Sequence, residues 1–181
     1  RSVSEGHKPS PPSPVGLVQQ KREEYLLSIF GPRLYATLPP DAQRTISRLS
    51  LSQLPLPADG VCQIADLDDN QVESCLATGV AYGLLQEFAA PPTAPAHPTL
   101  YLPPGLLRPW LSAESRLPAD QRQQVHACLA RFWRTVYELD REGELRVPIA
   151  RELATCRHHA AGATDGPLFL WATVALARYL T

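Results

Sequence analysis

Near the end of the chain lie side chains that could bind a metal ion or act as nucleophiles: Cys156, His158, His159 and, further upstream, His126. Thiolate and imidazole are preferred ligands of zinc, and a thiol beside an imidazole can be activated as a nucleophile. Neighbouring positions on a helix, however, project in directions about 100° apart. Adjacent histidines then rarely reach one ion, so we interpret the segment as a polar helix face. We expect no metal-binding residue and no reactive thiol at Cys156.

Other signatures of catalysis and of nucleotide hydrolysis are missing from the sequence. It contains neither a GxSxG nucleophile elbow nor a GxxxxGK[ST] phosphate loop. The sequence therefore predicts a protein that is not an enzyme, with no catalytic residue, no cofactor-binding residue and no cofactor.

The residues that we select as candidates for an interface are Trp110, Trp133, Trp171, Asp68 and Asp69. Tryptophan is enriched among the residues that dominate protein–protein binding, and a pair of carboxylates gives a helix end a distinct charge. Each tryptophan also fits an apolar helix face, and each aspartate fits a helix cap, so packing and capping remain the alternatives. The four cysteines are widely spaced, which favours buried thiols over a metal site or a disulfide framework.

The elements that would position these side chains follow from apolar periodicity and from the places of proline and glycine. A helix is expected over 15–30, interrupted by Gly31-Pro32, and a second begins after Pro39-Pro40. An extended segment over 54–57 precedes helices over 58–65 and 68–82, the latter capped by Asp68 or Asp69 and stopped by Gly83. Strands are expected over 84–88 and 99–102 around a proline-rich tip, followed by helices over 106–111, 119–140, 151–161 and 167–181.

Two strands joined by a loop directly after a helical pair are the layout of a winged helix-turn-helix domain. The sequence thus predicts a mainly α fold: a winged helix-turn-helix domain with a small β-wing, followed by an antiparallel α-helical array. We divide the chain into a flexible linker over 1–14, a helical lead-in and winged-helix domain over 15–112, and a helical, repeat-like domain over 113–181.

The charge of the predicted winged helix argues against DNA. Between Arg48 and Arg108 there is no Lys or Arg, and the same stretch holds six acidic residues. Affinity for DNA depends largely on Lys and Arg that neutralise phosphates. We therefore expect no nucleic-acid partner, although a winged-helix transcription regulator remains the third and disfavoured hypothesis.

The stretch from Leu38 to Leu111 resembles the winged-helix domain of STAND-type nucleotide-switch ATPases, in particular bacterial NB-ARC-like proteins. The residues that carry the resemblance are Leu38-Pro39-Pro40-Asp41-Ala42-Gln43, Arg48-Leu49-Ser50, Leu54-Pro55-Leu56-Pro57, Gly79-Val80-Ala81-Tyr82-Gly83-Leu84-Leu85, Leu100-Tyr101-Leu102 and Leu106-Leu107-Arg108-Pro109. The helices from Ala119 onward look like the start of the TPR-like superhelix that often follows in that family.

The resemblance implies a module that packs on a nucleotide domain and holds its closed state. In such proteins a histidine just after the second wing strand often touches the nucleotide phosphate. The matching position here is Pro104, which offers neither an imidazole nor an N–H. Direct nucleotide sensing by this segment is therefore not expected.

The sequence favours a regulatory and interaction module of a STAND-type signalling NTPase, which relays between a nucleotide domain and sensor repeats. The alternative is a stand-alone helical adaptor that binds a protein partner. The expected partners are other domains of the parent protein or a separate protein, and not a membrane, since no run of eighteen apolar residues occurs. The absence of methionine suggests a fragment of a longer chain, and the absence of a signal peptide a cytoplasmic location.

Overall fold

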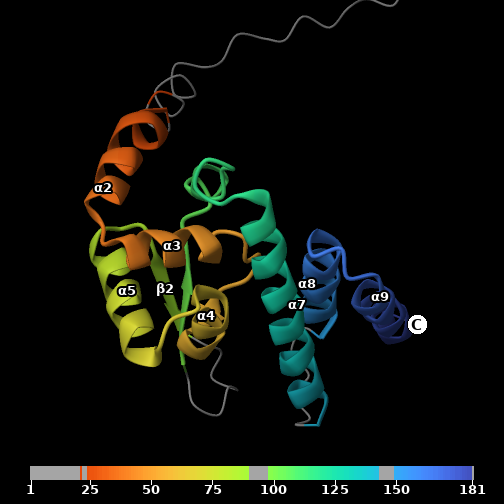
Figure 1. The fold of residues 1–181 in the computed structure, drawn as a ribbon. Coiled ribbons are helices and arrows are strands. Elements are labelled where there is room, and N and C mark those ends of the chain that lie inside the picture. Colours follow the sequence, from red (N-terminus) through yellow and green to blue (C-terminus); the bar gives the residue numbers. More distant parts are fainter. Residues whose placement is uncertain (1–20, 22–23, 90–97, 143–148, 181) are drawn as a thin grey trace, which may run out of the picture.

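The computed structural model describes residue 21 and residues 24–89, 98–142 and 149–180, which form a mainly helical fold with one small sheet (Figure 1). The elements in chain order are η1 (Leu26–Phe30, a π-helix), α2 (Gly31–Thr37), α3 (Pro40–Leu49), β1 (Leu56–Pro57), α4 (Ala58–Ala65), α5 (Asp69–Ala81), β2 (Gln86–Ala89), β3 (Thr99–Leu102), α6 (Arg108–Leu111), α7 (Ala119–Glu142), α8 (Ile149–Gly162) and α9 (Gly166–Leu180). The predicted linker over 1–14 lies outside the described residues.

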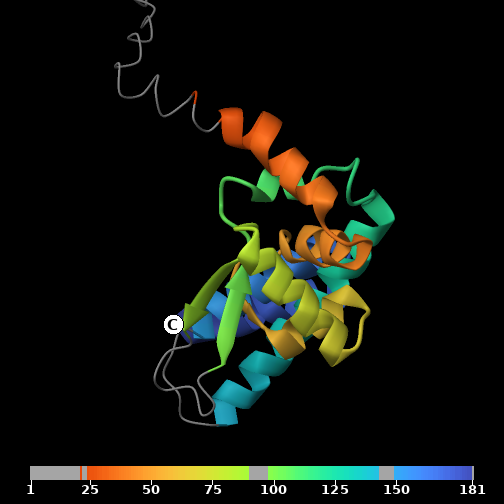
Figure 2. The ribbon, with the colours of Figure 1, turned by 90° about the vertical axis from the view of Figure 1, so that its left-hand side faces the viewer.

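The expected interruption at Gly31-Pro32 is wrong. The turn η1 continues directly into α2, and Figure 2 shows the two as one rod that leads away from the body of the molecule. Pro32 stands in the first turn of α2, where a helix makes no use of the backbone N–H that proline lacks. Gly31 and Pro32 therefore lie where the π-helix gives way to α2, and the helical path continues through them.

The sheet has the strand order β1-β3-β2, and both pairings are antiparallel. Leu56 pairs with Tyr101, so the proline-flanked segment that the sequence predicts as extended forms a short edge strand. The expected strand over 84–88 begins two residues later, at Gln86. The reason is the end of α5: the Gly79 carbonyl accepts the N–H groups of both Leu84 and Leu85, which draws these residues into a turn.

That turn depends on Gly83, whose φ of +68° lies in the left-handed region. A residue with a side chain adopts this conformation only at a cost, and Gly83 ends α5 where the sequence places the stop. At the other end, Asp68 accepts the N–H of Gln71, and the Gln71 side chain accepts the N–H of Asp68. This capping box confirms Asp68 as the N-cap.

The three predicted helices of the second half are confirmed, with small shifts at their ends, as α7, α8 and α9. Successive helices run in opposite directions, α7 packs against α4 and α8, and α8 packs against α9 (Figure 1). No helix within the described ranges is both long enough and apolar enough to cross a bilayer.

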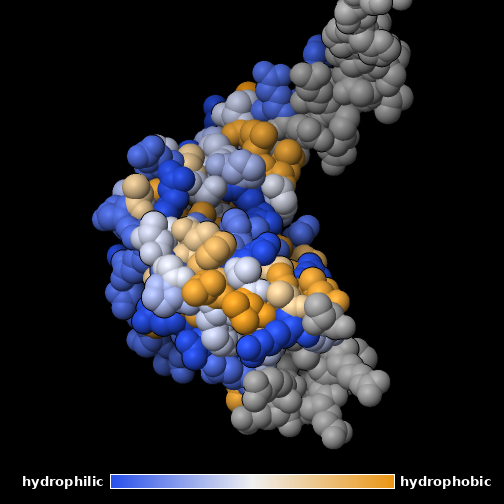
Figure 3. Space-filling model, turned by 90° about the vertical axis from the view of Figure 1, so that its right-hand side faces the viewer, coloured by the Kyte–Doolittle hydropathy of each residue, from blue (hydrophilic) through white to orange (hydrophobic). Residues whose placement is uncertain are grey.

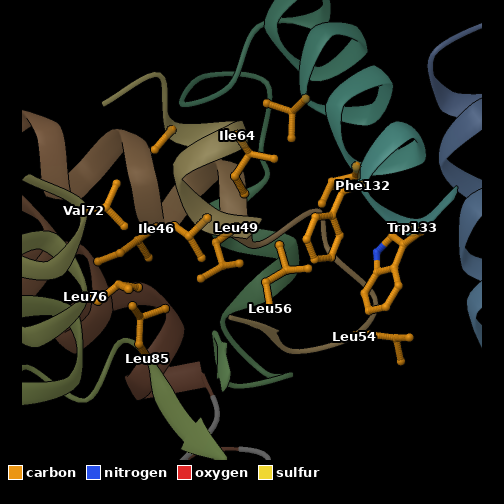
Figure 4. Close-up of a cluster of buried hydrophobic side chains, with 14 of the residues drawn as sticks. Ile46, Leu49, Leu54, Leu56, Ile64, Val72, Leu76, Leu85, Phe132 and Trp133 are labelled. Carbon is orange, nitrogen blue, oxygen red and sulfur yellow. The ribbon is translucent and has the colours of Figure 1, made fainter. Parts of the chain in front are cut away.

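One cluster of buried side chains joins the two halves of the chain. Phe132 and Trp133 of α7 lie beside Leu49, Leu54 and Leu56 from the first half (Figure 4). The division at residue 112 stays a prediction, and the two parts share this apolar core.

Two arginines hold the C-terminal ends of helices in place. Arg48 of α3 donates from Nη1 to the carbonyl oxygens of Ile64 (2.9 Å) and Ala65 (2.8 Å), which end α4. Arg108 of α6 donates in the same way to the carbonyls of Ser50 and Ser52, just beyond α3. The last carbonyls of a helix have no partner within the helix, so these contacts satisfy them and tie the short helices together.

Candidate functional site

The helix α9 presents an apolar surface that the described residues leave uncovered. Leu168 and Ala172 face inward against α8 and are buried. On the outside of the same helix, the exposed large apolar residues are Phe169 (41% exposed), Leu170 (63%), Val174 (41%), Tyr179 (51%) and Leu180 (70%). Figure 3 looks onto this side of the molecule and shows apolar residues gathered there. We call this surface the α9 face.

A shallow groove of about 750 Å³ runs along the α9 face. Apolar and aromatic side chains line most of it, including Leu170, Val174 and Tyr137, while Arg178 adds a cation. Contiguous exposed apolar surface of this kind makes the α9 face a candidate interaction site. The signal was present in the sequence, because the segment over 166–180 is apolar on all sides and has no clear polar face.

The three tryptophans selected from the sequence take different places. Trp171 lines the groove, where its ring meets the ring of Tyr137 (5.6 Å between centroids) and the guanidinium of Arg134 (4.9 Å). Trp133 is 6% exposed and lies in the core, so it does not offer a surface to a partner. Trp110 is half-buried, with the Arg116 guanidinium 3.8 Å from its ring centroid. Only Trp171 therefore belongs to the candidate interface.

The two aspartates lie far from that interface along the chain and have local roles. Asp68 is the N-cap of α5, and Asp69 accepts a hydrogen bond from the Cys62 thiol (3.3 Å). Both side chains are exposed, as is Glu73 on the same helix. The outer surface of α5 is therefore acidic.

A second candidate site lies where α7 and α8 pack together. His126 of α7 and His158 and His159 of α8 can each offer one ring nitrogen, and these three nitrogens lie within 4.8 Å of one another. The adjacent histidines do face different sides, since His158 is exposed and His159 is buried. His126 comes from the neighbouring helix and stands close to both rings, with centroids 5.9 Å from His158 and 5.1 Å from His159.

The close approach of α7 and α8 at this point requires Gly162. A Cβ atom at this position would lie 2.7 Å from the ring of His126, which is closer than side-chain carbons pack. Within the cluster, the Nδ1 atoms of His126 and His159 form a 2.8 Å hydrogen bond.

The buried rings of this cluster are held in the neutral form. Burial lowers the pKa of His159 to about 3, and the nearby His126 and His158 rings add to the effect. Burial also lowers the pKa of His126, with further contributions from His158 and Arg122. A neutral imidazole keeps a lone pair on one nitrogen, which is the form that binds a metal ion.

Cys156 does not join this cluster. Its thiol is buried and donates to the carbonyl of Ala130 (3.3 Å). Burial raises the pKa of Cys156 to about 11, so the thiol stays protonated at neutral pH. A protonated, buried thiol is neither a nucleophile nor a metal ligand.

Pro104, at the position that the family resemblance gives to a nucleotide-sensing histidine, has a structural role. Its carbonyl accepts the N–H groups of Leu107 and Arg108 and starts the turn that leads into α6.

In comparisons with known proteins, no family model and no curated protein matches this chain.

Proposed function

We propose that the chain is a non-catalytic regulatory and interaction module of a STAND-type signalling NTPase, which relays between a nucleotide domain and sensor repeats. The observation that carries the proposal is the α9 face. Large apolar side chains are exposed along successive turns of α9, which packs on one side against α8. Apolar residues on such a helix are covered when a further helix packs against it.

The order of elements supports a winged helix as the first half of this module. Helix α3 precedes β1, the helices α4 and α5 follow, and the antiparallel pair β2 and β3 comes next. In this proposal α5 takes the place of the recognition helix, and β2 and β3 form the wing. The strand order β1-β3-β2, with the first strand pairing against the last, fits that assignment.

The charge on α5 supports a protein partner over DNA for the winged helix. Asp69 and Glu73 are exposed there, and the stretch between Arg48 and Arg108 offers no Lys or Arg. A duplex would meet like charges at the helix that should enter its groove.

The relay function requires two separate contacts, and each has its own test. The first contact is with a nucleotide domain that precedes this chain in its parent protein. Binding between the two, measured by calorimetry with ADP, with ATP and with neither, is expected to depend on the nucleotide. No binding in any of these conditions, together with a parent protein that lacks a phosphate loop, would remove the relay and leave the helical adaptor.

The second contact is with helical repeats, through the α9 face. Leu170→Glu places a charge in the middle of that face and is expected to weaken binding to the repeats about tenfold or more, because a buried unpaired charge is costly. Binding to the nucleotide domain is expected to stay unchanged. The matched control is Ala77→Glu, an exposed alanine on α5. Equal effects of the two substitutions on repeat binding would show that the α9 face is not the contact.

A further inference from the structure

The histidine cluster has the composition of a metal site. Three imidazoles from two helices bring their ring nitrogens within 4.8 Å of one another. Ligands bound to one tetrahedral zinc ion lie about 3.3 Å apart, since each Zn–N bond is about 2.0–2.1 Å long. The nitrogens therefore have to approach one another to bind one ion, and the ring of His158 is exposed rather than packed in the core.

One nitrogen of the buried His159 ring lacks a hydrogen-bond partner within the described part of the chain. Its Nδ1 bonds to another histidine, and its Nε2 is buried with no hydrogen-bond partner among the described residues. Buried polar atoms are normally paired, and an unpaired one at a cluster of ligand residues points to a missing group. The neighbouring helix supplies no carboxylate or carbonyl to this nitrogen.

We propose that His126, His158 and His159 form a binding site for a divalent transition-metal ion of the zinc or nickel class, which fastens α7 to α8. Imidazole nitrogens select such ions over Mg²⁺ and Ca²⁺, which prefer oxygen ligands. Three protein ligands leave at least one coordination position to water. His158 is the exposed member of the cluster. This site is independent of the α9 face and of the relay function.

The charges around the cluster limit the affinity. Arg122 acts on His126 and Arg108 acts on His159, both as positive charges, and the cluster includes no carboxylate. A cation bound there meets some repulsion, so we expect binding in the micromolar range rather than the much tighter binding of structural zinc sites.

The test is a titration of the metal-free chain, without a polyhistidine tag, with Zn²⁺ and separately with Mg²⁺. We expect one Zn²⁺ per chain, a higher melting temperature in its presence and no binding of Mg²⁺. With Co²⁺ in place of Zn²⁺, the visible absorption of a low-symmetry cobalt complex with nitrogen ligands is expected.

Variants locate the ion. His158→Ala removes an exposed side chain, so the fold is expected to survive, while affinity for Zn²⁺ falls about tenfold or more and the rise in melting temperature disappears. His126→Gln is expected to do the same. The control is His97→Ala, which leaves all three proposed ligands in place and is expected to bind Zn²⁺ as the unaltered chain does. Absence of one-to-one binding, equal binding of Mg²⁺, or unchanged affinity in His158→Ala would overturn the proposal.

Discussion

Replacing Arg48 by alanine tests whether one side chain holds α3 and α4 together. The guanidinium makes two hydrogen bonds, at 2.9 and 2.8 Å, to the carbonyls of Ile64 and Ala65. A hydrogen bond with a charged partner contributes about 1.5–3 kcal/mol. Because Arg48 is only half-buried and water replaces part of the loss, we expect the free energy of unfolding to fall by about 2–4 kcal/mol in total.

The assay is urea unfolding followed by circular dichroism. For a domain of this size the unfolding free energy changes by about 2 kcal/mol per molar urea, so the midpoint should fall by about 1–2 M with an unchanged slope. The urea midpoint of Arg48→Lys is expected to lie between those of the unaltered chain and Arg48→Ala. An ammonium group keeps the charge but cannot reproduce the planar fork of a guanidinium.

The matched control is Arg44→Ala, one turn earlier on the same helix. Arg44 pairs with Asp41 on the surface, where both side chains are exposed, and such pairs contribute about 0–1 kcal/mol. If the midpoint of Arg48→Ala falls no further than that of Arg44→Ala, the two carbonyl contacts do not hold the end of α4, and the reasoning fails.

Three other substitutions or conditions give separate outcomes. Leu129→Ala, at a fully buried position of α7, should lower the free energy of unfolding by about 2–5 kcal/mol. Leu139→Ala on the same helix, where the residue is 64% exposed, should change it by less than about 0.5 kcal/mol. Comparable losses for the two variants in chemical denaturation would contradict the assigned core. Asp68→Ala removes the capping box of α5 and should cost about 0.5–2 kcal/mol, more than Glu73→Ala, as compared by thermal melting. The pKa of His159 is about 3 in the folded chain and about 6.5 in the unfolded chain, so between these pH values only the unfolded chain binds a proton at this residue. The free energy of unfolding is therefore highest above pH 6.5 and falls as the pH drops toward 3, by at most about 1.4 kcal/mol per pH unit. In His159→Gln, measured with a chelator present, this slope should flatten, and an unchanged slope would show that another group causes it.

Local signals placed most of the helices correctly. Asp68 caps α5 by a contact within four residues, and Gly83 ends it through its own backbone conformation, so both are visible in the sequence. The Gly31-Pro32 prediction failed because the same two residues suit the first turn of a helix as well as its end. The second failure, the start of β2, has a tertiary cause: Leu84 and Leu85 are both buried, and they follow the turn at the end of α5 rather than the strand.

The sequence alone determined the charge that argues against DNA, the absence of a phosphate loop and the apolar character of α9. Only the tertiary structure decided that Trp133 is buried while Trp171 borders a groove, and that His126 meets His159 across a separation of 33 residues. The physical reason is that helical periodicity fixes the direction of a side chain about its own axis. The rotation and offset of one packed helix against another then decide which side chains meet, and these depend on the fit of the whole interface.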